Sequence, residues 1–280
     1  FDYKFIKGRR FHAYKEGRYK FPNDEREQDR LDTMHHMVKL AMGGKLHLAP
    51  IDVTQPLRVL DVGTGTGIWA IEFGMGCQPG DKTDMPILTF PVYSVPPNVF
   101  FEVDDVEGLW PPRKPFDYIH CRYMCGSIED WSKLFQQAYE QTAPGGWVEF
   151  QEYHLVNYSQ DNSIPEDSSI IRFYEVLRQA CEAMNRPVTM GDKLPDYAAD
   201  VGFTNIVHRT FPLPLGAWPK DPTMKEVGAL KMLQLLDGLE AFSVATFTQL
   251  LGWQPEEVEV FLAKVRQDAM RKGVHMMTNL

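Results

Sequence analysis

The fold is decided by the stretch Arg58-Val59-Leu60-Asp61-Val62-Gly63-Thr64-Gly65-Thr66-Gly67-Ile68-Trp69-Ala70-Ile71-Glu72. It begins as an apolar strand, turns through three glycines at alternate positions and continues with helical composition. Glycine has no Cβ and adopts positive φ readily, so the chain can turn sharply here and a ligand can approach the backbone. A helix that begins near Gly67 presents unpaired N–H groups, which favour a carboxylate or a phosphate. The stretch therefore predicts a ligand site at the carboxyl end of a strand.

The spacing of the glycines indicates which ligand this is. The dinucleotide fingerprint is G-x-G-x-x-G, whereas the third glycine here comes one residue early and Ile68 stands in the fingerprint position. This spacing disfavours an NAD-dependent enzyme. Asp61 suits a positively charged amino group, and S-adenosylmethionine (SAM) offers an ammonium group for Asp61 and a carboxylate for the helix N-terminus. The candidate SAM-binding residues of this stretch are Asp61, Gly63, Thr64, Gly65 and Gly67.

Length and composition limit the class of protein. The chain has 280 residues, of which 44% are hydrophobic and 24% charged, as expected for one large globular domain with additions. The net charge is −9, which does not favour a broad nucleic-acid surface. No uninterrupted apolar run reaches the roughly 18 residues of a transmembrane segment. The four cysteines form no C-x-x-C motif and no zinc spacing, so we expect reduced thiols, an intracellular protein and no metal.

The N-terminal fifty residues predict an arm followed by a helix. Residues 1–22 interleave basic and aromatic side chains, which we expect to pack on the domain; a patch for an acidic partner or a lipid headgroup is the alternative. Asn23 or Asp24 is a suitable helix cap, and apolar residues at helical spacing predict a helix to about Met42.

The second strand is the weakest part of the expected α/β pattern. A doubly wound fold needs a strand after the first helix, and the best candidate between Gly74 and Val99 is 86–90, which ends without an acid for the ribose hydroxyls. The third strand is predicted at 99–103. In enzymes that bind SAM, an acid after this strand contacts the adenine amino group and the next backbone N–H meets the ring; by this likeness, the spacing makes Asp105 and Val106 the candidates here.

The fourth strand is predicted at 116–122, and its carboxyl end is where ligands lie in open α/β sheets. His120, Arg122 and Tyr123 are therefore candidates to contact cofactor or substrate, although a core histidine is an equal alternative for His120. A helix at 130–142 and a strand at 147–152 follow.

The remaining sequence predicts mostly helices. We expect a helix at 165–185 within a lid insertion at 156–200, a strand at 203–211, and helices at 224–239, 243–251 and 255–271. The expected parts are an N-terminal arm and cap helix (1–50), a SAM-binding Rossmann-like core (51–155), the lid insertion (156–200) and a C-terminal part that completes the domain (201–280).

With these parts in order, the chain resembles the fungal LaeA-like methyltransferases over nearly its whole length. The resemblance is carried by Phe21-Pro22-Asn23-Asp24-Glu25 with Arg30-Leu31-Asp32 and His35, by Leu60-Asp61-Val62-Gly63-Thr64-Gly65-Thr66-Gly67-Ile68-Trp69-Ala70, by Val95-Pro96-Pro97-Asn98-Val99, by Phe116-Asp117-Tyr118-Ile119-His120-Cys121-Arg122, by Pro144-Gly145-Gly146-Trp147-Val148-Glu149 and by Leu215-Gly216-Ala217-Trp218-Pro219. Both a LaeA-type member and a VipC/VapB-type member are compatible with these motifs. Members usually carry a second strand ending Gly-x-Asp-Leu-Ser, which this chain lacks.

The resemblance implies a class I SAM-methyltransferase fold, a doubly wound sheet with an N-terminal helical extension and a helical lid. It implies SAM as cofactor and a role in secondary metabolism and development, with protein as the suspected methyl acceptor. It further implies a heterodimer with a sister LaeA-like methyltransferase, contacts with a velvet-type regulator or a membrane-tethering zinc-finger protein, and residence in cytoplasm and nucleus or at a membrane through a partner.

Two functions from different classes remain open. The first is a methyltransferase that holds its nucleophile in line with the methyl group, with His120 as the first candidate for a general base and Tyr123 as the second. The alternative is a non-catalytic or weakly catalytic subunit that keeps the fold as a scaffold or heterodimer partner. The intact glycine loop favours the enzyme, and the unusual second strand favours the scaffold.

Overall fold

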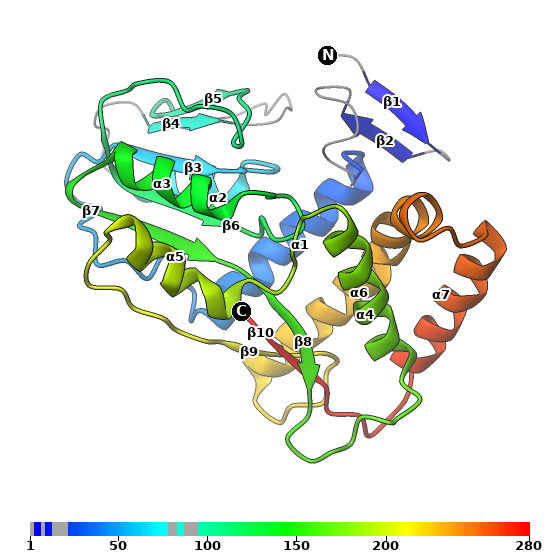
Figure 1. The fold of residues 1–280 in the computed structure, drawn as a ribbon. Helices are drawn as coiled ribbons and strands as arrows, with labels where there is room; N and C mark the ends of the chain where they lie inside the picture. Colours follow the sequence, from blue (N-terminus) through cyan, green and yellow to red (C-terminus); the bar gives the residue numbers. More distant parts are fainter. Residues whose placement is uncertain (1–2, 7–8, 13–21, 78–82, 87–94) are drawn as a thin grey trace. The chain divides into compact units, whose positions relative to one another are not determined.

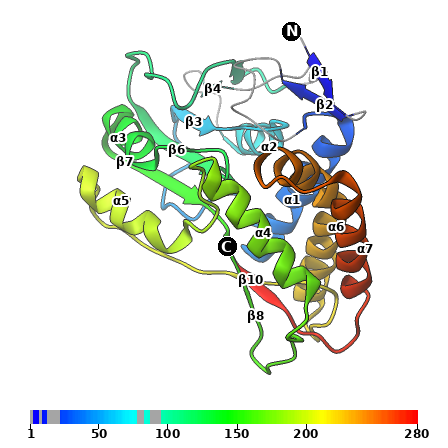
Figure 2. The same cartoon turned by 45° about the vertical axis from the view of Figure 1, so that its right-hand side comes forward.

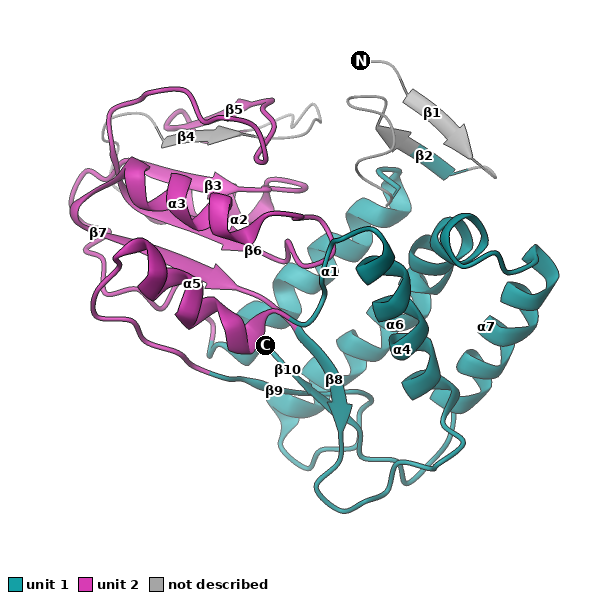
Figure 3. Cartoon of the chain, in the orientation of Figure 1, with its two compact units in different colours: residues 1–43, 154–189, 210–280 teal, residues 44–153, 190–209 magenta. Residues whose placement is uncertain are grey.

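The computed structural model describes residues 3–6, 9–12, 22–77, 83–86 and 95–280. It divides into two compact units (Figure 3). Unit 1 comprises Phe1–Gly43, His154–Thr189 and Thr210–Leu280, and unit 2 comprises Gly44–Tyr153 and Met190–Arg209. Most of the basic and aromatic arm at 1–22 lies outside the described residues. None of the helices described is long and apolar enough to cross a membrane.

Unit 2 is an α/β unit built on parallel strands (Figure 1). Its strands are β3 (Val59–Val62), β4 (Thr83–Pro86), β5 (Val99–Glu102), β6 (Phe116–Arg122) and β7 (Thr142–Gln151). Its helices are α2 (Ile68–Gly76), α3 (Trp131–Gln141) and α5 (Leu194–Val201), preceded by the 3-10 turn η1 (Gly191–Lys193). Strands pair in parallel in the order β3-β6-β7, and β4 pairs in parallel with β5. The predicted α/β class is confirmed.

The β3-β6-β7 sheet has helices on both faces, because its side chains alternate in direction. Leu60 and Ile119, with their register partner Val148, belong to an apolar cluster that includes the buried face of α3. Val59 and Tyr118 point the other way and pack with Trp69 and Phe73 of α2. Figure 2 shows the strands lying between α2 and α3. We call these the α3 face and the α2 face.

Two strand boundaries differ from the prediction. The second strand is β4, at Thr83–Pro86, earlier than the predicted 86–90; residues 87–94 lie outside the described part of the chain. The strand predicted at 147–152 is β7, which begins earlier, at Thr142, and includes Pro144-Gly145-Gly146; its pairing with β6 shifts register between Phe116 and Tyr118. The third and fourth strands and the helix between β6 and β7 are confirmed.

Unit 1 is mainly helical (Figure 1). Its helices are α1 (Glu25–Ala41), α4 (Ser169–Ala183), α6 (Pro222–Leu250) and α7 (Pro255–Ala269). Its strands are β1 (Tyr3–Ile6), β2 (Arg9–His12), β8 (His154–Tyr158), β9 (Pro212–Pro214) and β10 (Met277–Asn279). β1 and β2 form an antiparallel pair, and β8, β10 and β9 form an antiparallel sheet in that order. Helices α4, α6 and α7 share one apolar core around Phe173, Leu239 and Phe247.

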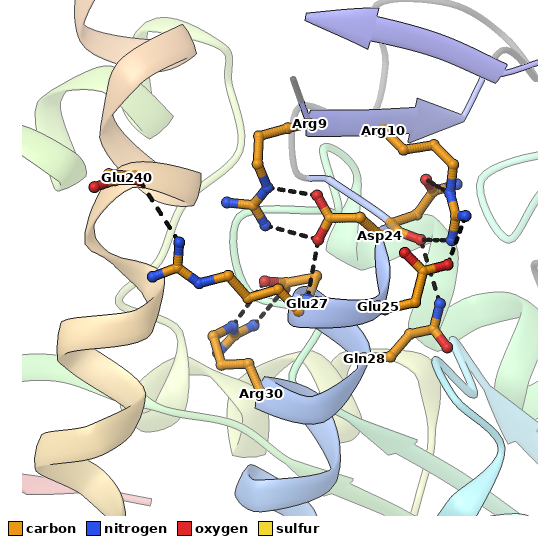
Figure 4. A network of polar contacts seen from close by, with 10 residues as sticks. Arg9, Arg10, Asp24, Glu25, Glu27, Gln28, Arg30 and Glu240 are labelled. Atoms are coloured by element: carbon orange, nitrogen blue, oxygen red, sulfur yellow. Dashed lines mark hydrogen bonds and ion pairs between the residues drawn. The ribbon is translucent and has the colours of Figure 1, made fainter. Parts of the chain in front are cut away.

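A polar network fixes β2 to the start of α1 (Figure 4). Asp24 caps α1, as predicted, by accepting the N–H of Glu27, and its carboxylate also accepts hydrogen bonds from Arg9. Arg10 donates to the Glu25 carboxylate at 2.8 Å. One turn into the helix, Glu27 and Arg30 form a buried ion pair at 2.6 Å. The network is a structural anchor of the helix start.

Two predictions in the C-terminal part are wrong. The helices expected at 224–239 and 243–251 form one helix, α6, because the Ser243 hydroxyl donates to the Leu239 carbonyl inside the helix instead of capping a new one. The strand expected at 203–211 does not form: residues 205–210 are all exposed, so the segment has no buried face to direct strand pairing. Helices α1, α4 and α7 are confirmed.

Candidate active site

The glycine loop between β3 and α2 has the backbone that its sequence predicts. Gly63, Gly65 and Gly67 have φ values of +72°, +60° and +82°, which residues with a Cβ rarely adopt. Gly67 is the N-cap of α2 and provides no side-chain cap, so the first turn of the helix keeps its N–H groups for another partner. The Thr64 hydroxyl donates to the Asp61 carbonyl at 3.0 Å and helps to fix the loop.

Asp61 and His120 form a buried pair at the centre of the sheet. They are register partners on the parallel strands β3 and β6, so their side chains lie on the same face. His120 Nδ1 is 2.7 Å from Asp61 Oδ1, and the two residues are only 1% and 3% exposed. A carboxylate only accepts hydrogen bonds, so Nδ1 carries the proton in this hydrogen bond.

The imidazole of His120 is held in place from a second direction. It stacks on the Trp69 indole of α2, with ring centroids 3.8 Å apart and the planes 4° from parallel. The Trp69 indole is itself fixed, because its Nε1 donates to the Leu46 carbonyl at 2.9 Å. His120 Nε2 is buried and has no hydrogen-bond partner within the described part of the chain. A buried polar atom without a partner is uncommon and indicates a group that another molecule can satisfy.

Two more polar residues, Glu149 and Tyr118, lie beside the Asp61–His120 pair on the α2 face. Glu149 of β7 is the register partner of His120 and accepts hydrogen bonds from the N–H groups of Leu48 and Ala49, each at 2.8 Å. The Tyr118 hydroxyl donates to the same carboxylate at 3.1 Å. Burial, with the Glu149 and Asp61 charges, raises the pKa of Tyr118 well above its ordinary value. Glu149 therefore anchors the segment that precedes β3.

Arg122 lies at the carboxyl end of the same face. Burial lowers the pKa of Arg122, and the negative charge of Asp61 opposes this shift. Arg122 is thus close enough to Asp61 for their charges to interact, as the sequence predicts for two residues of one site.

The turn after β6 packs against the glycine loop. Tyr123 has φ of +61°, which is rare for a residue other than glycine, and its N–H donates to the Gln151 carbonyl at 3.0 Å. Its ring contacts Tyr153 edge to face. The next side chain, Met124, lies directly on Gly63: a Cβ added to Gly63 would be 2.2 Å from the Met124 Sδ atom. At this glycine the space beside the backbone is filled by methionine.

Glu152, the residue that follows β7, holds this turn. Its carboxylate accepts the N–H groups of both Met124 and Cys125, at 2.7 and 3.0 Å, and the residue is 4% exposed. Burial raises the pKa of Glu152 to about 7, and the two N–H donors and Arg122 counteract the rise only in part. A buried carboxyl with a pKa near neutrality directly after a strand of the sheet is characteristic of functional sites.

Asp105 and Val106 lie in the turn that follows β5. The Asp105 carboxylate accepts the Glu107 N–H at 3.1 Å, and the Val106 carbonyl accepts the Trp110 indole N–H at 3.0 Å, so both residues shape a tight turn. The neighbouring acids Glu102 and Asp104 form ion pairs with Arg113, with N–O distances of 2.7 and 4.0 Å.

The structure thus brings together Asp61, the glycines, His120 and Arg122. Asp105 and Val106 lie in the turn after β5, and Val106 packs against the same apolar cluster as Met124. Sequence reasoning missed Trp69, Met124, Glu149 and Glu152. The available signal for Glu152 was an acid at the carboxyl end of a predicted strand, where site residues of α/β proteins gather. No cluster of three or more metal-binding side chains occurs among the residues that the structure describes.

Comparison with known proteins identifies the family. The family model described as a methyltransferase domain matches residues 34–208. The methyltransferase pytC of Aspergillus terreus is 44% identical over 98% of this chain and 84% of its own length. The secondary metabolism regulator LAE1 of Cochliobolus heterostrophus is 33% identical over 98% of this chain and 91% of its own length, and the secondary metabolism regulator laeA of Aspergillus fumigatus is 32% identical over 96% and 72%. The chain therefore belongs to the LaeA-like family of SAM-dependent methyltransferases and is a methyltransferase with SAM as its cofactor.

Proposed function

We propose that this methyltransferase regulates secondary metabolism and development in a fungus by methylating a protein. The observation that carries the catalytic part is the Asp61–His120 pair beside the glycine loop, with His120 Nε2 buried and unpartnered in the described structure. The regulatory part rests on relatives of similar length that are named secondary metabolism regulators. A protein acceptor is the expectation that follows from the family resemblance.

The residues present fit SAM. Three glycines take φ values in the left-handed region, the loop is exposed at Gly63 and Gly65, and the uncapped first turn of α2 suits a carboxylate. Asp61 supplies a negative charge two residues before the loop. At Gly63 the neighbouring Met124 is an unbranched, adaptable side chain, which can rearrange around a ligand.

Each of the candidate residues then has one task. SAM supplies an electrophilic methyl group on its sulfonium sulfur. Asp61 would bind the ammonium group, the N–H groups at Gly65 and the start of α2 would bind the carboxylate, and Asp105 with Val106 would bind the adenine. Because methyl transfer depends mainly on alignment of the nucleophile, holding both partners in place is the largest contribution of the protein.

His120 would accept the proton of the methyl acceptor as a general base. The hydrogen bond to Asp61 fixes the imidazole tautomer with the lone pair on Nε2, which is the arrangement of an oriented general base. Stacking on Trp69 keeps the ring from rotating. Tyr123, held with a strained backbone at the end of β6, is the second candidate for this role.

We further propose that the chain works in an assembly. The expected partners are a sister LaeA-like methyltransferase in a heterodimer, and a velvet-type regulator or a membrane-tethering zinc-finger protein, in cytoplasm and nucleus. Within such an assembly a weakly catalytic scaffold is the second candidate function. The observation in its favour is Met124, which fills the space beside the first glycine of the loop.

Methyl-labelled SAM tests the proposed acceptor. The purified chain is incubated with labelled SAM and a fungal nuclear extract, and protein and small-molecule fractions are counted separately. We expect label in protein bands that depends on the chain and is absent with His120→Gln. Label confined to small molecules would contradict the protein acceptor, and no label in either fraction, with SAM bound, would favour the scaffold.

A further inference from the structure

We propose that Glu152 is a positioning residue of the cofactor site, which fixes the turn Tyr123-Met124-Cys125 so that Met124 forms one wall of the glycine loop. The inference rests on the proposed function, because it assigns Glu152 to the same site. Glu152 touches neither the loop nor His120 in any contact described above; it acts through the backbone of the turn.

The first step is the geometry of the carboxylate. One oxygen accepts the Met124 N–H and the other accepts the Cys125 N–H, so the group bridges two successive amides. Hydrogen bonds to an ionised acceptor are roughly twice as strong as those between neutral groups. The ionised carboxylate therefore holds the turn more firmly than the protonated acid, which has one oxygen occupied by its own proton.

The second step connects the turn with the loop. The backbone that Glu152 fixes carries the Met124 side chain, which lies on Gly63 at the distance of direct contact. The strained φ of Tyr123 persists only if its surroundings hold it, and the bonds on either side of Met124 do so: Tyr123 N–H to the Gln151 carbonyl and Cys125 N–H to Glu152. Loss of the carboxylate charge would loosen one of these two supports.

The third step concerns the charges around Glu152, which determine the pH range in which its carboxyl group ionises. The groups that face Glu152 are Arg122 and Cys121 of β6 and Cys125 of the turn; only Arg122 is charged, because burial raises the pKa of both thiols well above their ordinary value. Glu152 thus loses its charge as the pH falls through about 7. A preorganised wall favours binding, so SAM should bind more tightly above this pH than below it.

The test is a pH series with two readouts. In ¹⁵N-labelled protein we expect the amide resonances of Met124 and Cys125 to titrate with a midpoint near pH 7, and the affinity for SAM, measured by calorimetry, to rise several-fold, up to about tenfold, from about pH 5.5 to about pH 8.5. Glu152→Gln should abolish both changes. Glu149→Gln is the matched control: it alters a carboxylate on the same strand that also accepts two backbone amides, and it should leave the titration of Met124 and Cys125 in place.

Met124→Ala keeps Glu152 and its hydrogen bonds to the two backbone amides. This variant therefore tests the inference even if Glu152→Gln does not fold. We expect this variant to retain the amide titration and to lose the pH dependence of SAM affinity. Amides that do not titrate in the wild type, or a pH profile of affinity that Glu152→Gln and Met124→Ala leave unchanged, would overturn the inference alone. A wild-type chain that binds no SAM at any pH would overturn the proposed function as well.

Discussion

The two faces of the β3-β6-β7 sheet are built from alternate residues of the same strands, yet they differ in chemistry. The α3 face carries Leu60, Ile119, Cys121 and Phe150 in one apolar cluster. The α2 face carries Asp61, His120 and Glu149 side by side in register. Parallel strands buried on both sides are usually apolar throughout, so a polar row on one face is retained at a cost in stability. The difference indicates that the α3 face supports the fold and the α2 face performs the chemistry.

The most direct test of this difference between the two faces is to change neighbouring residues of one strand that point to opposite faces. His120→Gln should reduce methyl transfer by about 100- to 10,000-fold, because it removes the proposed base. Formation of S-adenosylhomocysteine with the acceptor fraction measures this. Cys121→Ala is the control on the same strand, and it should lower stability and leave the turnover of the folded protein unchanged. Equal turnover in wild type and His120→Gln would remove the catalytic role of the α2 face.

A large effect on stability is expected on the α3 face. Ile119 is fully buried, so Ile119→Ala leaves a cavity and should lower the free energy of unfolding by about 2–5 kcal/mol. Urea unfolding followed by circular dichroism gives this value. The affinity of the remaining folded protein for SAM should match the wild type; a parallel loss of affinity would show that the two faces are not separate in function.

A smaller effect is expected where the glycine loop meets the turn. Gly63→Ala places a Cβ in the left-handed region and against Met124, and it should cost about 1–2 kcal/mol from backbone strain alone. Met124→Ala removes the clash, so the double variant should recover part of the loss. A double-mutant cycle of unfolding free energies measures the coupling. Strictly additive losses would mean that the contact between Met124 and Gly63 does not exist in solution.

The smallest effect concerns a hydrogen bond on the α2 face that has no proposed role in catalysis. Tyr118→Phe removes the donor to Glu149, which keeps its bonds to the Leu48 and Ala49 amides. We expect a loss of about 1 kcal/mol in unfolding free energy and unchanged turnover. A strong loss of turnover would extend the functional part of the α2 face to this tyrosine.

Much of the fold follows from local sequence. The glycine loop, the fourth strand and the cap of α1 were predictable because each depends on neighbouring residues: positive φ at Gly63, Gly65 and Gly67, an apolar run, and a side chain at Asp24 that caps its own helix. The strand expected at 203–211 failed because strand formation needs a partner, which sequence pattern does not reveal. The break expected in α6 failed because a hydroxyl that suits a cap also bonds within a helix.

The site was predictable residue by residue but not as an arrangement. Asp61 and His120 were both identified as candidates, yet their pairing depends on the register of β3 against β6, across 59 positions of the chain. Glu152 and Met124 were missed for the same reason, since the contact of Met124 with Gly63 and the amide bonds of Glu152 join segments that are distant in sequence. Tertiary contacts determine which of several acids becomes part of a site.

The central claim is that the polar face of the sheet and its glycine loop bind SAM. Calorimetric titration of SAM into the wild-type chain and into Asp61→Asn tests it most directly, because asparagine keeps the shape of the side chain and removes its charge. We predict wild-type binding tighter than about 1 mM, which corresponds to about −4 kcal/mol, and a loss of most of this affinity in Asp61→Asn. No detectable wild-type binding, or equal affinity in both proteins, would contradict the claim.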